Sequence, residues 1–246
     1  GIDDPGARSL GLNLVSVAVE TASSALGVFS GIRERIKVQV LKLLLRVASC
    51  STEDGPLLSR VLAIITNIFH SMKIHLRVPI ELLFTQVYLK TLRDPTLPYD
   101  CKEVAMESLL DLIKTPGVLL ELYVNYDAEP TVTMLFAQVF KFLCRTVFST
   151  SGTLTSIQVL ALEGIVSSLQ QFGLHHSPNP APAALEFAQE VRTKAKIKRQ
   201  LQLAAEHFNR DADKGVKFLE TSGLVPLPIT AAAVASFLRT NPALHK

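Results

Sequence analysis

An all-α fold is predicted from three features of this 246-residue sequence. Apolar residues recur three and four positions apart, as at Leu58, Val61, Leu62, Ile65 and Phe69, which places them on one face of a helix. No segment alternates apolar and polar residues for long, as a half-buried strand does. Polar connections containing proline or glycine separate the periodic segments. Successive helices that are apolar on more than one face indicate an α-solenoid of HEAT/armadillo-like helical pairs, followed by a linker and extra C-terminal helices.

In chain order, each predicted helix ends where proline, glycine or clustered polar residues interrupt the apolar period. Up to residue 171 the predicted helices cover residues 8–27, 31–50, 55–73, 77–93, 100–114, 117–124, 130–148 and 153–171. Two prolines in residues 93–100 prevent one continuous helix there, and Tyr99 and Asp100 are expected to cap the helix that follows. Because no residues repeat identically at a fixed period, an irregular helical bundle is the alternative to the solenoid.

Composition changes after residue 171. Residues 172–183 contain three prolines and two adjacent histidines, which is typical of a linker. One long polar helix and two shorter helices are predicted beyond it, at residues 184–208, 212–221 and 231–239. The expected organisation is an upstream helical domain, a Pro-rich linker and a C-terminal helical part, at residues 1–171, 172–183 and 184–246.

Composition and charge exclude several classes of protein. Hydrophobic residues make up 48% of the chain, yet no uninterrupted apolar run reaches the length of about 18 residues that a membrane-spanning helix needs. The three cysteines lie far apart without metal-ligand spacing, so reduced thiols in a cytoplasmic protein are expected. The N-terminus has no signal-peptide pattern. A net charge of only +3 argues against a nucleic-acid partner.

The positive charge is concentrated in one run, residues 192–200. Its basic members are Arg192, Lys194, Lys196, Lys198 and Arg199. A solvated helix face is the simpler interpretation of such a run, and a contact surface for an acidic partner or for anionic lipid is the sharper one. No aromatic residues are interleaved with the charges, which makes base stacking improbable.

Polar, turn-prone residues interrupt two apolar helices at residues 125–129. Asn125 tolerates a left-handed conformation and is expected to close the first helix. Asp127 or Glu129 would accept hydrogen bonds from the free amides of the next helix, with Pro130 just inside its start. Tyr126 is expected to bury its ring. A tight corner between helices therefore accounts for every polar residue here, and spacing alone does not make it a functional site.

The same corner and its flanks resemble a known domain. Residues 98–169 look like the homology-upstream-of-Sec-seven (HUS) domain of the large Arf guanine-nucleotide exchange factors, whose hallmark box is Asn-Tyr-Asp-Cys-Asp. The box here is Asn125, Tyr126, Asp127, Ala128 and Glu129, which matches three of the five positions, with Ala128 in place of cysteine. The flanking strings LPYDCKEVAMESL and FSTSGTLTSIQVLALEGI are similar to the Golgi-type branch (Gea-like, brefeldin-A-resistance).

A second resemblance follows in the C-terminal part. Residues 194–225 and 234–246 look like the first helices of the Sec-seven (Sec7) catalytic domain. The residues that fill the family pattern are Phe208, Asn209, Lys214, Gly215, Phe218 and Leu219. In this family the side chains of Phe218, Leu219 and Phe237 would pack on later helices. The sequence leaves three alternatives for them here: they dock on the solenoid, exchange between copies, or stay mobile.

The resemblance implies a chemistry that this chain is not expected to perform alone. Exchange in this family uses an acidic residue, the glutamic finger, directed at the Mg²⁺ and the β-phosphate of bound GDP. That residue and the groove for the GTPase lie in later Sec7 helices, so the chain, ending at Lys246, is expected to lack them. No phosphate-binding loop or nucleophile elbow occurs either. We therefore predict no catalytic, cofactor-binding or metal-binding residues.

The resemblance also implies partners and a location. It predicts a non-catalytic regulatory and interaction domain that contacts the N-terminal dimerisation and cyclophilin-binding domain of the same protein and its own Sec7 domain. Through the Sec7 domain it would act indirectly on an Arf-family GTPase. Golgi membrane and other small GTPases are further expected partners, and the location would be cytoplasmic with peripheral association to Golgi membranes.

Two other classes of function fit the sequence less well. A general helical adaptor unrelated to small GTPases would not need the Phe-Asn and Lys-Gly-x-x-Phe-Leu pattern that follows the predicted linker. An enzyme in its own right has no supporting set of residues in the sequence. The regulatory domain is therefore the preferred interpretation.

Overall fold

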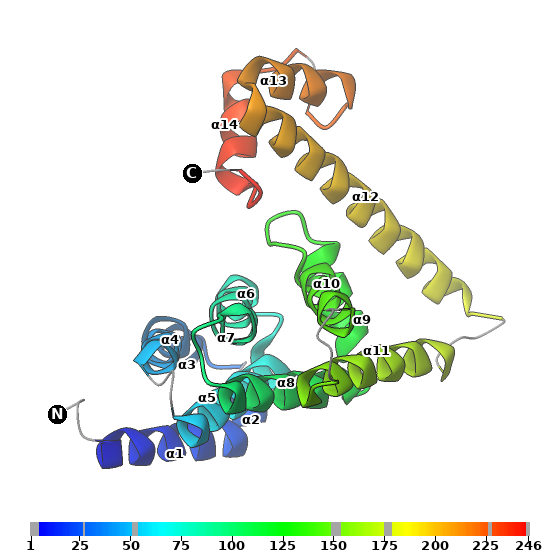
Figure 1. Cartoon of the computed structure of the whole chain (residues 1–246). Coiled ribbons are helices and arrows are strands. Elements are labelled where there is room, and N and C mark those ends of the chain that lie inside the picture. Colours follow the sequence, from blue (N-terminus) through cyan, green and yellow to red (C-terminus); the bar gives the residue numbers. More distant parts are fainter. Residues whose placement is uncertain are drawn as a thin grey trace. The chain divides into compact units, whose positions relative to one another are not determined.

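The computed structural model describes residues 5–26, 28–50, 54–148, 154–174, 179–225 and 228–244. All regular elements within these ranges are helices, which confirms the predicted all-α class (Figure 1). None of the helices in these ranges is both long enough and apolar enough to cross a membrane.

The chain divides into two compact units. The first consists of Gly1–Val118 and Val139–Leu174, and the second of Leu119–Gln138 and His175–Lys246. Residues 119–138, which are predicted to belong to the upstream helices, cluster with the C-terminal helices in the structure. The division of the chain into domains at 1–171, 172–183 and 184–246 stays a prediction.

The first unit holds most of the helices. They are α1 (Pro5–Thr21), α2 (Ser23–Leu26), α3 (Ser30–Arg35), η1 (Ile36–Val40), α4 (Leu41–Cys50), α5 (Gly55–Met72), α6 (Arg77–Leu83), η2 (Phe84–Leu89), α7 (Lys90–Arg93), α8 (Tyr99–Lys114), α11 (Ser156–Leu174) and the greater part of α10 (Leu135–Val147). The η elements are π-helical turns inside longer helices, so α3–η1–α4 and α6–η2–α7 correspond to the predicted helices 31–50 and 77–93.

Helices of the first unit pack in series. Helix α5 lies between α1 and α8, and α8 in turn lies between α5 and α11 (Figure 1). A helix that packs mainly on the helices before and after it is the arrangement of an α-solenoid. The core is richest along α5, where Val61, Ile65 and Phe69 are fully buried. Burial of each such side chain contributes about 1.5–3 kcal/mol.

Capping residues explain where several of these helices begin. Asp54 precedes α5 and its carboxylate accepts a hydrogen bond from the amide of Leu57 at 3.0 Å. Helix α8 begins at Tyr99, after Pro98, and no side chain caps it. The predicted capping by Tyr99 and Asp100 is therefore wrong, because both residues already belong to the first helical turn.

The second unit contains the predicted corner and the C-terminal helices. Its helices are α9 (Val118–Leu122), η3 (Tyr123–Asp127), the first turn of α10, α12 (Pro182–Arg210), α13 (Ala212–Thr221) and α14 (Ala231–Thr240). Asp211 caps α13 by accepting from the amides of Asp213 and Lys214, and Thr230 caps α14 by accepting from that of Ala233. Helix α11 continues to Leu174 and α12 begins at Pro182, and residues 175–178 of the predicted linker lie outside the described ranges.

The corner itself differs from the prediction in two ways. Asn125 lies within η3, and none of the described residues other than glycine has a positive φ angle. The helix closes instead through a wide π turn, in which the amide of Ala128 donates to the carbonyl of Tyr123 at 2.9 Å. Helix α10 begins at Leu135, so Pro130 is not in its first turn. Residues 128–134 form the connection.

Candidate functional site

Asp127 joins the corner to the next helix. It is buried, and its two carboxylate oxygens accept hydrogen bonds from the amides of Phe136 at 2.8 Å and Ala137 at 3.0 Å. These amides open α10 and have no partner inside the helix, so the carboxylate caps it and also meets the positive end of its dipole. The predicted capping role of Asp127 is confirmed. Glu129, the other candidate, accepts from the hydroxyl of Thr131 at 3.0 Å.

Tyr126 connects the corner to α12. Its side chain is fully buried, as predicted, and its backbone carbonyl accepts a hydrogen bond from the ammonium group of Lys198. Lys198 lies on α12 and is only 1% exposed. The last carbonyls of a helix carry partial negative charge, so an ammonium donor is favoured at the end of η3.

An apolar contact supports this hydrogen bond. Ala128 packs in one buried cluster with Val191 and Ala195 of α12, and Tyr123 and Val124 pack against the cluster. The small side chain of Ala128, which is 1% exposed, leaves room for α12 to come close. Within the second unit, α12 thus packs against the corner through Ala128 and Tyr126. This contact is called the seat of α12 below.

The position of Lys198 corrects one expectation about the basic run. Arg192, Lys194, Lys196 and Arg199 are exposed, but Lys198 is buried and cannot present its charge on a surface. The reason is its place on α12, because Val191, Ala195 and Lys198 are four and three positions apart and share the face toward the corner. Lys194 also pairs with Glu190 at 2.6 Å, as an ordinary surface ion pair does.

The charge state of Asp127 is tied to this environment. Burial raises the pKa of Asp127 above its ordinary value, although the amides of Ala137 and Phe136 and the charges of Lys198 and Arg199 act in the opposite direction. The carboxylate is therefore held in the corner at a cost in desolvation. Protonation of Asp127 is therefore expected to change the stability of this unit.

Asp127→Asn is expected to remove a pH dependence of stability. A raised pKa in the folded state means that the stabilisation by the bound proton is full below about pH 4, where unfolded aspartate titrates, and is lost as the pH rises through the folded-state pKa. The free energy of unfolding of the unmodified chain should therefore fall, relative to Asp127→Asn, between acid and neutral pH in urea titrations.

Asp211→Asn provides the matched comparison with the opposite sign. The amide of Lys214 is the main cause that lowers the pKa of Asp211, so its contribution is present above about pH 4 and is lost as the pH falls. Parallel pH profiles of the unmodified chain and Asp127→Asn would contradict the assignment of Asp127.

The residues of the Sec7 pattern pack the C-terminal helices together. Gly215 of α13 lies so close to α12 that a Cβ atom added to it would be 2.6 Å from the Cα atom of Phe208. Phe208 and Phe218 pack on a buried cluster that contains Leu219 and Phe237. These apolar side chains therefore pack on one another across α12, α13 and α14, which answers the question that the sequence left open.

Two asparagines and one lysine complete this arrangement. The amide nitrogen of Asn209 donates to the carbonyl of Ala243 at 2.9 Å, and that of Asn241 donates to Leu201 at 2.9 Å. Lys214 pairs with Asp211 at 3.4 Å, next to the cap of α13. Asn209 and Lys214 belong to the predicted pattern, whereas Asn241 was missed.

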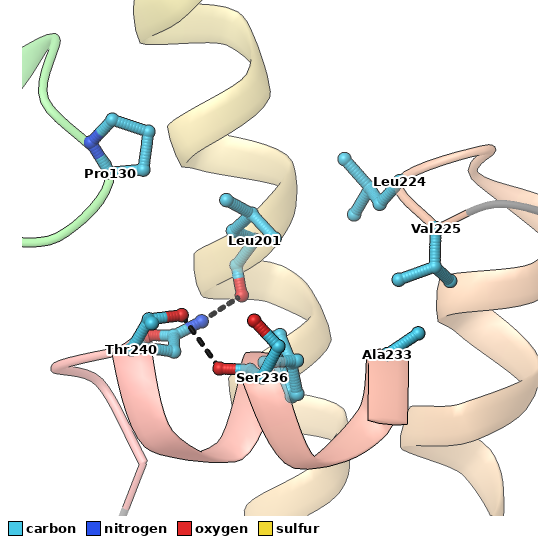
Figure 2. A pocket seen from close by; sticks show the side chains of 9 residues that line it. Pro130, Leu201, Leu224, Val225, Ala233, Ser236 and Thr240 are labelled. Carbon is cyan, nitrogen blue, oxygen red and sulfur yellow. Dashed lines mark hydrogen bonds between the residues drawn. The ribbon is translucent and has the colours of Figure 1, made fainter. Parts of the chain in front are cut away.

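A cavity of about 270 Å³ lies between α12, α14 and the chain that follows α13. Figure 2 shows Leu201, Leu224 and Val225 on its apolar side, with Ser236 and Thr240 of α14 opposite. Two of its polar side chains form hydrogen bonds within the unit: the hydroxyl of Thr240 donates to the carbonyl of Ser236 at 2.8 Å, and the amide nitrogen of Asn241 donates to the carbonyl of Leu201 at 2.9 Å. None of the described residues that line it has a titratable side chain.

Comparison with known families identifies the upstream region. The family model described as "Mon2/Sec7/BIG1-like, HUS domain" matches residues 5–135, more than half of the chain. The chain belongs to this family. The Sec7 domain matches residues 197–246 of this HUS-domain protein. The resemblance noted in the sequence is confirmed at both regions.

Curated relatives cover nearly the whole chain. The ARF guanine-nucleotide exchange factor GNL2 of Arabidopsis thaliana is 31% identical over 277 residues, covering 99% of this chain and 20% of that relative. The exchange factor GNOM of the same plant is 26% identical over 260 residues, covering 96% of this chain and 18% of GNOM. The Golgi-specific brefeldin A-resistance guanine nucleotide exchange factor 1 homolog of Caenorhabditis elegans is 25% identical over 304 residues, with coverages of 96% and 15%. The chain spans a fifth or less of these relatives.

The corner lies inside one matched family region and contacts the other. The box at residues 125–129 lies in the HUS-domain match, and Lys198 lies in the Sec7 match. The hydrogen bond from Lys198 to Tyr126 therefore links the two regions inside one compact unit. In the sequence, the three-and-four spacing of Val191, Ala195 and Lys198 places Lys198 on the apolar face of its helix, but it does not indicate the box as the partner of that face.

Proposed function

We propose that this chain is a regulatory and interaction region of an Arf guanine-nucleotide exchange factor that acts in Golgi vesicle trafficking. The names of the relatives support this assignment, since two are ARF exchange factors and a third is a Golgi-specific exchange factor homolog. In this proposal the protein is cytoplasmic and associates peripherally with Golgi membranes. The chain does not itself catalyse exchange, and it controls or recruits the exchange domain.

The observation that carries the proposal is the seat of α12 on the box. Helix α12 runs without interruption from residue 182 to residue 210, so one rigid element extends from the contact with Ala128 into the Sec7 pattern at Phe208. A change at the box would therefore be felt at the start of the exchange domain. This coupling gives the HUS domain a physical means of restraining or orienting that domain.

The proposed partner of the HUS domain is the N-terminal dimerisation and cyclophilin-binding domain of the same protein. Binding of that domain near the box would alter the seat of α12 and so pass information to the exchange domain. An Arf-family GTPase would be an indirect partner, through the Sec7 domain, and Golgi membrane and other small GTPases would be further ones.

Asp127→Ala in the full-length exchange factor tests this function. We expect it to change the rate of Mg²⁺-dependent nucleotide exchange on an Arf GTPase and to weaken binding of the N-terminal dimerisation domain. Both follow because the variant removes the cap of α10 beside the seat of α12. The measurements are fluorescent nucleotide release and a pull-down with the isolated partner domain.

Asp54→Ala is the matched control. It also removes an aspartate that caps a helix, but Asp54 caps α5 in the first unit and does not belong to the box. It should lower stability to a similar extent and leave regulation and partner binding unchanged. If Asp127→Ala leaves folding, exchange and partner binding unchanged, the box does not have the proposed role.

A further inference from the structure

An open cleft of about 410 Å³ lies between α7 and α10 in the first unit. Its lining residues are Leu92, Arg93, Lys141, Phe142, Arg145 and Thr146. The volume is within the range of small-ligand sites. Three of the six residues carry a positive charge and none carries a negative one, so the cleft favours an anion.

Among the described residues, no carboxylate forms an ion pair with the cations of the cleft. Within the part of the chain that the structure describes, Arg93, Lys141 and Arg145 form no ion pair, whereas Lys114, Lys194 and Lys214 do. The carboxylate that follows Arg93 in sequence is turned elsewhere: Asp94 accepts hydrogen bonds from the amide and the hydroxyl of Thr96, at 2.9 and 2.6 Å. Three basic side chains from two helices therefore converge with their charges available.

An exposed aromatic ring lies on the same side of α10. The amide of Phe148 donates to the carbonyl of Cys144 at 3.1 Å, so Phe148 continues the helical geometry past the end of α10. Lys141, Arg145 and Phe148 are four and three positions apart and share one face. The Phe148 side chain is 80% exposed. A large apolar ring beside unpaired cations is the composition of surfaces that bind an anionic membrane.

We propose that this cleft binds the phosphate groups of an anionic phospholipid headgroup, with Phe148 entering the membrane interface. Arg93 and Arg145 would contact phosphate oxygens with their planar guanidinium groups, Lys141 as a point charge, and the hydroxyl of Thr146 as a donor. The proposal rests on the peripheral membrane role proposed above, but binding to vesicles tests the cleft without any exchange reaction. An anionic membrane supplies both the phosphate groups for the cations and an apolar interface for Phe148, whereas an acidic peptide supplies the second only if it also carries an apolar side chain.

The test is co-sedimentation of the full chain with vesicles of phosphatidylcholine containing a phosphorylated phosphatidylinositol. Lys141→Glu/Arg145→Glu is expected to weaken binding at least about tenfold, because each charge near an anionic surface contributes to binding and reversal makes it repulsive. The matched control is Lys42→Glu/Arg46→Glu. Lys42 and Arg46 are also four apart, exposed and in the first unit, but they do not line the cleft. The control should change binding by no more than about twofold.

Two further arms separate the lipid from a free phosphate compound. Phe148→Ser should weaken vesicle binding while leaving the binding of a soluble inositol phosphate unchanged in calorimetry. If Phe148→Ser has no effect on vesicles, or if both double variants lose binding equally, the proposal is overturned in favour of free phosphate or of general electrostatic attraction. If circular dichroism shows that the α10 double variant does not fold, Arg93→Glu on the opposite wall of the cleft replaces it. This variant should also weaken binding to vesicles.

Discussion

Lys198→Met is expected to lower the free energy of unfolding by about 1–3 kcal/mol. The substitution keeps most of the volume of the buried side chain but removes the ammonium donor to the carbonyl of Tyr126. Replacing a buried charge with an apolar group can be neutral when both members of a pair are replaced together. In Lys198→Met the buried carbonyl of Tyr126 and the buried carboxylate of Asp127 both remain without the ammonium group. The substitution is therefore expected to destabilise the chain.

A second readout separates this role from simple packing. The positive charge of Lys198 lowers the pKa of Asp127, so Lys198→Met should raise that pKa further, as measured by NMR titration. Lys198→Ala should be less stable than Lys198→Met, because it also leaves a cavity beside Ala128. Lys196→Met, two positions along and exposed, is the control and should change stability by about 0.5 kcal/mol or less. An unchanged stability and an unchanged Asp127 pKa in Lys198→Met would contradict the assignment.

The helices were predictable because burial imposes the apolar period on the sequence. The core of α5 shows this, since its buried residues are those that recur three and four apart. The start of α10 was not predictable in the same way. Its cap, Asp127, lies nine positions before Phe136, so the carboxylate caps a helix across a connection rather than from the preceding residue. The π turn that begins at Tyr123 is not predictable either, because it does not change the spacing of apolar residues in the sequence.

The sequence predicts the residues of the corner, but it does not predict that Lys198 of α12 contacts them. Tyr126 and Asp127 are buried as their residue types suggested, and Asp127 caps the next helix. The missed element is the burial of Lys198, which lies in a basic run that the sequence predicts to be a solvated helix face or a contact surface. Its burial depends on a carbonyl 72 positions earlier in the chain, and a single sequence does not report such a contact.

Gly215→Ala is the second change with a large expected effect, a loss of about 1–3 kcal/mol in the free energy of unfolding. The added Cβ would be 2.6 Å from both the Cα and the Cβ of Phe208 and 2.8 Å from its ring. Backbone atoms of α12 cannot rotate away as the end of a side chain can, so α13 must move. That movement would disturb the cluster around Leu219 and Phe237, which holds α12, α13 and α14 together.

Gly11→Ala is the control, and it is expected to change stability in the opposite direction. Gly11 lies within α1 and has no atom within 4 Å of an added Cβ, so alanine there should stabilise the chain by about 0.5–1 kcal/mol through its helix propensity. Urea unfolding measures the stability of both variants. In Gly215→Ala, hydrogen exchange should show that the loss of protection is confined to the amides of α13 and of the residues that contact it. If alanine at 215 stabilises the chain as it does at 11, the close approach of α13 to Phe208 does not determine how the Sec7 pattern packs.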